Sequence, residues 1–189
     1  MAKEKAAGYF FITEVVLMEK KEARTLAILV NNRSGVLMRV VGLFSRRGYN
    51  IDSLSVGETE QSQISRITVV VTCEESVFEQ IKRQVEKLVD VIRVYGMTRS
   101  GSLQRELVLV KILATEENRS HVVEIGDIFK ARILDVTPST VTFQLTGSLE
   151  KIESFLTLVR PYGISELART GITALERGSR ALSEVEFEN

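Results

Sequence analysis

The stretch AILVNNRSGVLMRVVGLFSRRGYNI, residues 27–51, decides the fold of this chain, because it contains a strand, a turn, a helix and the start of a second strand. An apolar run over residues 26–30 predicts the strand, and it stops at the polar turn 31–35. Over residues 34–47 the apolar side chains recur at helical spacing, and Gly48, just past the last of them, closes the helix. The turn therefore presents unpaired backbone N–H groups at a helix N-terminus, which is a place for a small carboxylate.

The polar residues of this turn have two interpretations. Asn32, Ser34 and Gly35 are residue types that commonly cap helices and form turns, so a structural role explains them. The functional interpretation is that the free N–H groups bind a carboxylate, with Asn32 and Asn50 flanking the same helix N-terminus. Taken alone, the turn favours the structural interpretation.

Further strands and a second helix follow the turn. The segment 50–60 and the alternating run 64–73 predict two strands that pair as a hairpin around a polar connection. Acidic residues at 74–75 open a helix with apolar residues at helical spacing, and 91–97 predicts another strand. Together with the first strand, at 24–31, these elements give the order βαββαβ.

The same order is repeated at a spacing of about 80 residues, after a polar, glycine-containing stretch at 99–102. Strand patterns occur at 106–114, 132–137, 140–146 and 164–175, and helical patterns at 118–131 and 148–160, the latter capped by Ser148. We therefore predict an α+β chain of two tandem ferredoxin-like units, each an antiparallel sheet with both helices on one face. The expected division is an N-terminal extension (1–23), a first domain (24–100), a second domain (104–178) and a C-terminal tail (179–189).

The predicted strands carry apolar residues on both faces of their sheets. In the first strand of the second repeat, Leu107 and Leu109 alternate with the equally apolar Val108, so the face without helices is also apolar. Edge strands with unpaired backbone groups are a second reason to expect a partner. Homodimerisation is the simplest way to cover these surfaces, and we expect it.

The composition is that of an ordinary soluble globular protein. Of the 189 residues, 44% are hydrophobic and 26% are charged, and 25 basic side chains balance 25 acidic ones. This balance excludes a bulk attraction to nucleic acid or to an anionic membrane. The single cysteine, Cys73, excludes an intrachain disulfide and fits a small core residue. The apolar segment 8–18 contains Glu14 and is too short to span a bilayer, so we expect a cytoplasmic protein.

The sequence lacks the residue patterns typical of an enzyme. His121 is the only histidine, and no nucleophile motif surrounds it. The dinucleotide-binding, phosphate-loop and metalloprotease signatures are absent, and the glycines are spaced as turns and packing contacts. We therefore expect a non-catalytic chain with no cofactor and no metal of its own.

Six stretches carry a resemblance to a known family. They are NNRSGVLMRVVGLFSRRGYNIDSLSVGETE (31–60), SRITVVV (65–71), VEKLVDVIRV (85–94), QRELVLVKI (104–112), ILDVTPS (133–139) and ARTGITAL (168–175). These stretches resemble the small, regulatory subunit of acetohydroxyacid synthase, also called acetolactate synthase, and the first three lie in what resembles its ACT domain. Because the resemblance covers residues 24–178, it concerns the whole chain and not one motif.

The resemblance implies a regulatory function in branched-chain amino-acid biosynthesis. In that family a separate catalytic large subunit carries thiamine diphosphate, magnesium and usually FAD, and the small subunit raises its activity and makes it sensitive to valine. The resemblance also implies a homodimer in which two ACT sheets join side by side, with the effector held between subunits. Carried over residue by residue, the effector-binding candidates are Asn32, Gly35, Val36, Asn50 and Ile51.

In the implied site the N–H groups near Gly35 and Val36 face the carboxylate of the effector, and the two asparagine amides orient its polar end. Arg33 departs from the family pattern, because an acidic or neutral residue would be unremarkable there, and it bears on ligand affinity or partner contact. The corresponding turn of the second repeat, 115–119, is acidic and lacks a glycine. We therefore expect only the first domain to bind the effector.

Alternative functions share parts of this pattern. Acylphosphatase-like hydrolases have the same order of elements and need a phosphate-cradling arginine and a water-positioning asparagine, for which Arg33 and Asn50 are available. The tandem second domain and the long ACT resemblance argue against a hydrolase. An amino-acid-responsive transcription factor would need a basic helix-turn-helix segment, which the sequence lacks. A stand-alone amino-acid-sensing ACT protein is the remaining alternative.

Overall fold

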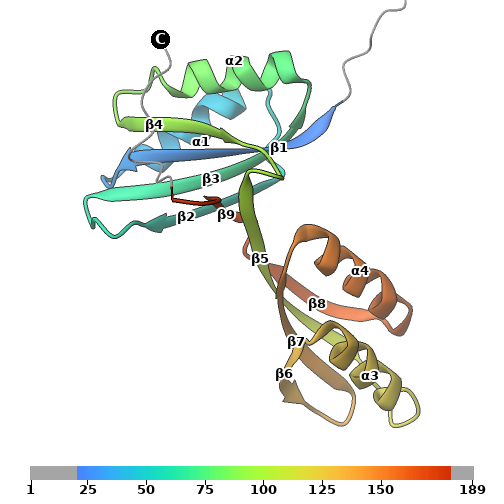
Figure 1. Ribbon diagram of the computed structural model, residues 1–189. Coiled ribbons are helices and arrows are strands. Elements are labelled where there is room, and N and C mark those ends of the chain that lie inside the picture. The colour runs from blue at the N-terminus through green and yellow to red at the C-terminus, as the bar shows by residue number, and fades with distance from the viewer. Residues whose placement is uncertain (1–20, 180–189) are drawn as a thin grey trace, which may run out of the picture.

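Two units with the predicted βαββαβ order follow one another along the chain (Figure 1). The computed structural model describes residues 21–179, so nearly all of the predicted N-terminal extension and C-terminal tail lie outside the described residues. The first unit consists of β1 (Glu22–Asn31), α1 (Val36–Arg46), β2 (Ser53–Glu58), β3 (Ile64–Cys73), α2 (Glu75–Val85) and β4 (Val91–Met97). The second consists of β5 (Ser102–Leu113), α3 (Arg119–Phe129), β6 (Arg132–Val136), β7 (Thr140–Gly147), α4 (Leu149–Val159), a 3-10 turn (Arg160–Tyr162) and β8 (Ile164–Arg169), and a short strand, β9 (Thr173–Glu176), follows it.

The first sheet has the strand order β2-β3-β1-β4, with antiparallel pairing throughout. α1 and α2 cover one of its faces (Figure 1). Between helices and sheet lies a core that contains the fully buried Phe44, Ile67 and Ile81. Burial of one such side chain contributes about 1.5–3 kcal/mol, so this core holds β1 in place and fixes where its C-terminal turn emerges.

The second sheet has the order β6-β7-β5-β8, and α3 and α4 cover one face of it. Phe143 and Phe155 pack edge to face in its core, with ring centroids 5.9 Å apart. Ser148 caps α4 as predicted, since its hydroxyl oxygen accepts a hydrogen bond from the Lys151 N–H at 3.4 Å. The predicted α+β class with two ferredoxin-like units is confirmed.

The predicted strand at 164–175 is interrupted in the structure. β8 ends at Arg169, Gly171 adopts a left-handed backbone conformation (φ +75°), and β9 begins at Thr173. The interruption falls at a glycine because only glycine adopts this conformation without a steric penalty. β5 is longer than predicted and begins at Ser102. Its first four residues pair with β9, and the rest of β5 pairs with β7 and β8.

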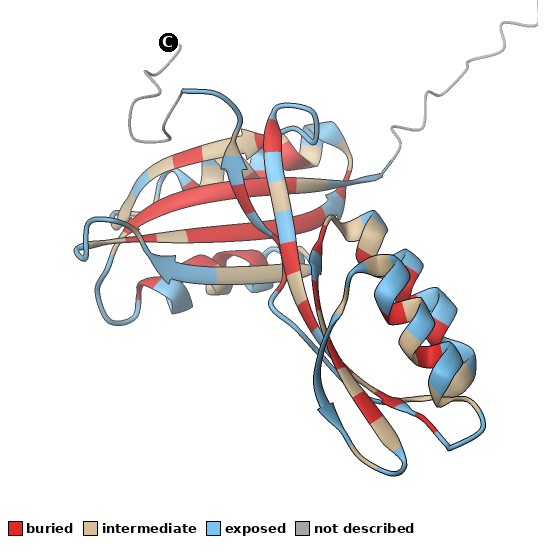
Figure 2. Ribbon diagram, turned by 60° about the horizontal axis from the view of Figure 1, so that its bottom comes forward, coloured by how far each residue is buried: buried red, intermediate tan, exposed pale blue. Residues whose placement is uncertain are grey.

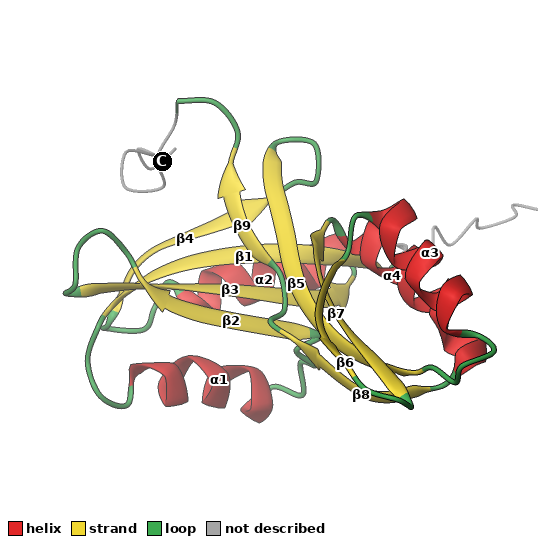
Figure 3. Cartoon of the chain, turned by 90° about the horizontal axis from the view of Figure 1, so that it is seen from below, coloured by secondary structure: helices red, strands yellow, loops and turns green. Residues whose placement is uncertain are grey.

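The paired segments Ser102–Arg105 and Thr173–Glu176 lie on the face of the first sheet that the helices leave open (Figure 3). The buried apolar residues at this contact are Ala27, Leu29, Val70 and Met97 of the sheet and Ile172 and Ala174 of the C-terminal segment. We expected a second copy of the chain to cover the open sheet faces. On the first sheet, part of the cover comes from the chain itself.

The open face of the second sheet carries exposed leucines. Along β5, Leu109 and Leu113 are 38% and 46% exposed, whereas Val108 and Val110, which point toward the helices, are fully buried. This alternation is visible as changing colours along β5 in Figure 2. The second sheet therefore has the apolar open face that the sequence predicted, and homodimerisation stays a prediction.

Candidate functional site

The predicted effector turn connects β1 to α1. α1 begins at Val36 and not at the predicted residue 34, because Gly35 adopts a left-handed conformation (φ +82°) that ends the turn. The Asn32 N–H donates to the Gln63 carbonyl oxygen (2.7 Å) and so ties the turn to the start of β3. Beside Gly35 the space is open, since no described atom lies within 4 Å of the position that a Cβ would occupy.

The N-terminus of α1 keeps hydrogen-bond donors free. In the described part of the chain, no side chain caps α1, and its first turn contains no acidic residue. The Arg39 N–H bonds one turn back, to the Gly35 carbonyl oxygen at 3.1 Å. The N–H groups of Leu37 and Met38, which precede it, therefore lie at the open end of the helix. Free donors and the helix dipole together favour an anion at this position.

Asn32 is exposed and joins this turn to the β2–β3 connection. Its Nδ2 donates to Glu58 Oε1 (3.0 Å) and to the Ser62 carbonyl oxygen (2.8 Å). No local sequence pattern predicts these two partners, because they lie about 30 residues further along the chain and approach only through strand pairing. Asn32 thus has a structural role through its amide nitrogen.

Asn50 is exposed and belongs to a second chain of hydrogen bonds. Its Nδ2 donates to Asp52 Oδ1 (3.0 Å), and the Thr72 hydroxyl donates to Asp52 Oδ2 (2.7 Å). The Asp52 N–H in turn donates to the Val70 carbonyl oxygen (2.9 Å). Ile51, between the two polar residues, is half-buried against the first core. These contacts fix the backbone that leads into β2.

The structure divides the five predicted site residues into two groups. Asn32, Gly35 and Val36 lie at the N-terminal end of α1, whereas Asn50 and Ile51 follow its C-terminal end. With 11 residues, α1 is about 16 Å long at 1.5 Å per residue. The expectation that both asparagines flank the same helix N-terminus is therefore wrong within one chain. The helix carries the chain back along the sheet, so the two groups lie at opposite ends of its strands.

The described residues contain no second centre of chemistry. His121 is exposed on α3. Within residues 21–179 no group of three or more His, Cys, Asp or Glu side chains is placed to hold a metal ion. Cys73 is buried at the end of β3, as predicted, and burial raises the pKa of its thiol. Over the same range no helix is long and apolar enough to cross a membrane.

Comparison with known proteins identifies the family. Residues 26–93 match the family model described as the AHAS small subunit-like ACT domain, and residues 105–178 match that of the small subunit of acetolactate synthase. The chain is 45% identical over 162 residues to a probable acetolactate synthase small subunit of Methanothermobacter thermautotrophicus, covering 85% of this chain and 96% of that protein. It is 44% identical over 158 residues to the acetolactate synthase small subunit of Mycolicibacterium smegmatis, covering 84% and 93%.

A solved structure supports the same conclusion. The crystal structure of the acetolactate synthase small subunit from Thermotoga maritima superposes with a TM-score of 0.77 at 34% identity, covering 84% of this chain and 99% of that one. Sequence and fold therefore agree over both units. The chain belongs to the acetolactate synthase small subunits, the regulatory ACT-domain subunits of an enzyme whose catalysis is carried by the large subunit.

Proposed function

We propose that this chain activates its large subunit and makes acetolactate synthesis sensitive to valine or a related branched-chain amino acid. The open N-terminus of α1 is the observation that supports it. The free N–H groups of Leu37 and Met38 bind the carboxylate of the effector, whereas the Val36 N–H of the predicted site donates to the Arg33 carbonyl oxygen at 3.3 Å. In this proposal residues 24–100 bind the effector, and residues 104–178 serve dimerisation and contact with the large subunit.

The effector site we propose is shared by two copies of the chain. A free amino acid is too small to reach both ends of α1, which are about 16 Å apart. Asn32 and Asn50 therefore act on one ligand only if they come from different copies. A homodimer provides this when its two-fold axis runs across the middle of α1. The start of α1 in one copy then lies near the end of α1 in the other.

The edge of the first sheet fits such a dimer. β2 is an edge strand, and Asn50 lies three positions before its first residue, Ser53, whereas Asn32 is hydrogen-bonded to Glu58, its last residue. When two β2 strands pair antiparallel across a two-fold axis, the start of one lies opposite the end of the other. Asn50 of one copy then approaches Asn32 of the other, and Ile51 contributes an apolar surface for the effector side chain.

Single substitutions test the two halves of the site. Asn32→Ala or Asn50→Ala removes one hydrogen bond to a charged ligand, worth about 1.5–3 kcal/mol, so valine affinity falls roughly tenfold to a hundredfold. Activation of the large subunit is retained, because it depends on a different surface. Calorimetry on the full chain and valine titration of the reconstituted enzyme measure the two effects. Asn118→Ala, at the corresponding helix start of the second unit, is the matched control and leaves valine affinity unchanged.

A mixed dimer tests whether the site is shared. When Asn32→Ala and Asn50→Ala chains are combined, one site of the mixed dimer carries both substitutions and the other carries neither. In an equal mixture with random pairing, about half of the dimers are mixed, so about a quarter of all sites should bind with wild-type affinity. A site contained in one chain would stay defective in every mixture, and that result would contradict the shared arrangement. Unchanged valine sensitivity in both single variants would contradict the site itself.

A further inference from the structure

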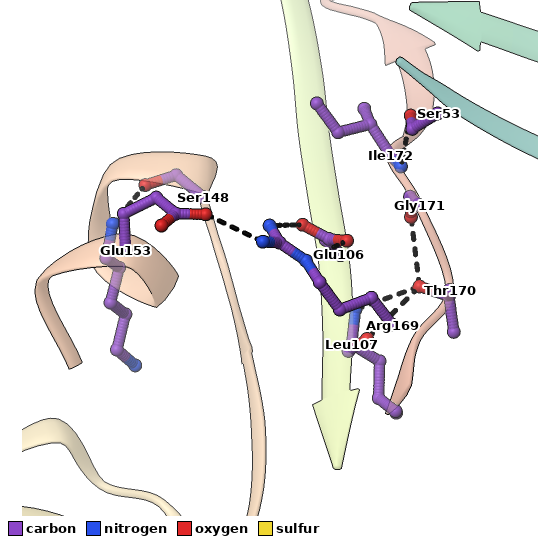
Figure 4. Close-up of polar contacts among 10 residues, drawn as sticks. Ser53, Glu106, Leu107, Ser148, Glu153, Arg169, Thr170, Gly171 and Ile172 are labelled. Atoms are coloured by element: carbon purple, nitrogen blue, oxygen red, sulfur yellow. Dashed lines mark hydrogen bonds and ion pairs between the residues drawn. The ribbon is translucent and has the colours of Figure 1, made fainter. Parts of the chain in front are cut away.

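The end of the second unit returns to the first unit and contacts β2. The Ser55 hydroxyl donates to the Ile172 carbonyl oxygen (2.9 Å), and the Ile172 N–H donates to the Ser53 hydroxyl oxygen (3.3 Å). Figure 4 shows Ile172 beside Ser53, with Gly171 and Thr170 leading away toward β5. We call residues 170–174 the strap. It links two parts of the chain that are more than 110 positions apart in sequence.

The strap fits closely against the first sheet. Gly171 has φ +75°, and a Cβ on it would lie 3.3 Å from the Ser53 side chain and 3.4 Å from the Leu54 nitrogen. A larger residue there is therefore strained and also pushed away from β2. Ile172 is only 7% exposed, and Arg66 Nη2 of β3 donates to the Ala174 carbonyl oxygen at 2.7 Å. Docking thus combines apolar burial, polar contacts and a glycine at the point of closest approach.

At its other end the strap is fixed to the second unit. The Thr170 N–H donates to the Leu107 carbonyl oxygen of β5 (3.1 Å), and the Leu107 N–H donates to the Thr170 hydroxyl oxygen (3.1 Å). The preceding residue, Arg169, forms a bidentate ion pair with Glu106 (2.7 and 2.9 Å) and also contacts Glu153 of α4 at 2.7 Å (Figure 4). A displacement of the strap therefore acts directly on β5 and α4.

The docking position is also close to the proposed effector site. Ser53 follows Asn50 by three residues, and Asp52 lies between them. The Asn50 amide donates to Asp52, which also accepts from Thr72. An effector that engages the Asn50 amide changes the hydrogen bonding of Asp52, whose neighbour holds the Ile172 N–H. Occupancy of the site can thus change the hydrogen bonding of the strap through only a few intervening residues.

The docked arrangement contains unsatisfied polar groups. Arg66 Nε and Glu176 Oε2 are buried without a hydrogen-bond partner among residues 21–179. Buried polar atoms without partners raise the free energy of the docked state. They bring it closer to the free energy of alternative arrangements in which these atoms are hydrated. An element that couples two sites requires such a second arrangement, with a free energy only slightly higher than that of the first.

We propose that the strap couples the effector site to the second unit: binding of the amino acid stabilises the docked strap, and docking sets the position of β5 and α4 that the large subunit meets. This rests on the proposed effector site. The strap thereby transmits occupancy from the first unit to the second, and its loss uncouples them without removing the binding site.

Hydrogen exchange on the full chain tests the first half of this proposal. Saturating valine should slow amide exchange at 102–107 and 170–176 by about fivefold or more, the lower end of ordinary coupling. Exchange in the β6–β7 hairpin, 132–147, serves as the internal reference and should not change. Valine binding with unaltered exchange in the strap overturns the coupling alone. Absence of valine binding to the wild-type chain overturns the effector site and the coupling together.

Variants in the reconstituted enzyme test the second half. The double variant Ser53→Ala, Ser55→Ala removes both polar contacts to Ile172, and Gly171→Val displaces the strap by strain. Because the coupling is reciprocal, valine binding to the isolated chain should weaken by no more than about the fivefold coupling itself, whereas inhibition of the reconstituted enzyme at saturating valine should be largely lost. Ser45→Ala, an exposed serine on α1, is the matched control. The proposal is overturned if valine inhibits an enzyme reconstituted with either strap variant as fully as it inhibits the wild-type enzyme.

Discussion

The first strand-to-helix turns of the two units differ although the units share one fold. In the first unit the turn ends with the left-handed Gly35 and leaves the N-terminus of α1 open. In the second unit, Arg119 Nη2 donates to the carbonyl oxygens of Pro138 (2.5 Å) and Ala114 (3.5 Å) and so ties the turn to the β6–β7 connection and to the end of β5. Acidic residues at 116–117 add repulsion of anions there. One order of elements therefore gives a turn with an open helix N-terminus in the first unit and a turn tied to the β6–β7 connection in the second.

The difference extends through the second unit. Its buried carboxylate, Glu106, is paired with Arg169, and this hydrogen-bonded pair raises the pKa of Arg169 above its ordinary value. Its helix α4 is capped by Ser148, whereas α1 has no side-chain cap in the described chain. The comparison teaches that the second unit uses Glu106 and Ser148 in structural contacts, whereas the first unit leaves the N–H groups at the start of α1 available to a ligand.

The largest expected effect comes from breaking the buried pair of the second unit. Arg169→Met leaves the Glu106 side chain, which is 4% exposed, without its cation, and should lower the free energy of unfolding by about 3–5 kcal/mol. Lys111→Met is the matched control, because Lys111 pairs with Glu166 on the same two strands at 39% and 72% exposure, where a pair is worth about 0–1 kcal/mol. Urea unfolding measures both. Equal decreases in the free energy of unfolding would show that the buried and the exposed ion pair contribute equally to stability.

A smaller effect is expected from helix glycines of the two units. In α3 a Cβ on Gly126 would lie 2.3 Å from Phe143 Cε1, so Gly126→Ala overpacks the second core and should cost about 1–3 kcal/mol. In α1 a Cβ on Gly42 meets only the flexible end of Arg46 at 3.3 Å, so Gly42→Ala should be neutral or stabilise by up to about 1 kcal/mol. Thermal unfolding measures the stability of both variants. If both are destabilised, the expected difference between the two helix glycines is wrong.

The smallest expected effect concerns the helix caps. Ser148→Ala should cost about 1 kcal/mol, whereas Ser34→Ala, before the uncapped α1, should cost less. The pKa of Glu150 is lowered by its own backbone N–H, by Ser148 and by Arg99. A lowered carboxyl pKa adds stability above the ordinary value of about 4.3, and this contribution is lost as the pH falls through the folded value. The difference in free energy of unfolding between wild type and Ser148→Ala should therefore be smaller at pH 3 than at pH 7, and urea unfolding at both pH values measures it.

Most elements could be predicted from the sequence because their signals are local. The helical spacing after the turn and the alternation in 64–73 depend on neighbours within a few residues, and the structure has helices and strands there. Gly35 and Ser148 mark the starts of α1 and α4 for reasons that act within one turn. The hydrolase alternative used the same local order, and only family membership separated it from the regulatory interpretation.

What the sequence did not reveal depends on pairing between distant segments. The relative position of Asn32 and Asn50 follows from the direction in which α1 crosses the sheet, which no local pattern gives. The contact of Ile172 with β2 joins residues more than 110 apart. One signal was available: Gly171 interrupts an otherwise regular strand pattern, and such a glycine often marks a close approach of another backbone.

The cover that 172–174 provides for the first sheet also has a consequence for the order of events during synthesis. Every strand and helix of the first unit has been synthesised once Met97 is made, yet Ala174, which covers its open face, is added roughly 80 residues later. At about 5–20 residues per second the nascent first unit carries an uncovered apolar surface for roughly 4–16 s. During that interval Leu29 and Val70 are available to chaperones and to neighbouring nascent chains, and the exposure ends when β9 is made and docks on the first sheet.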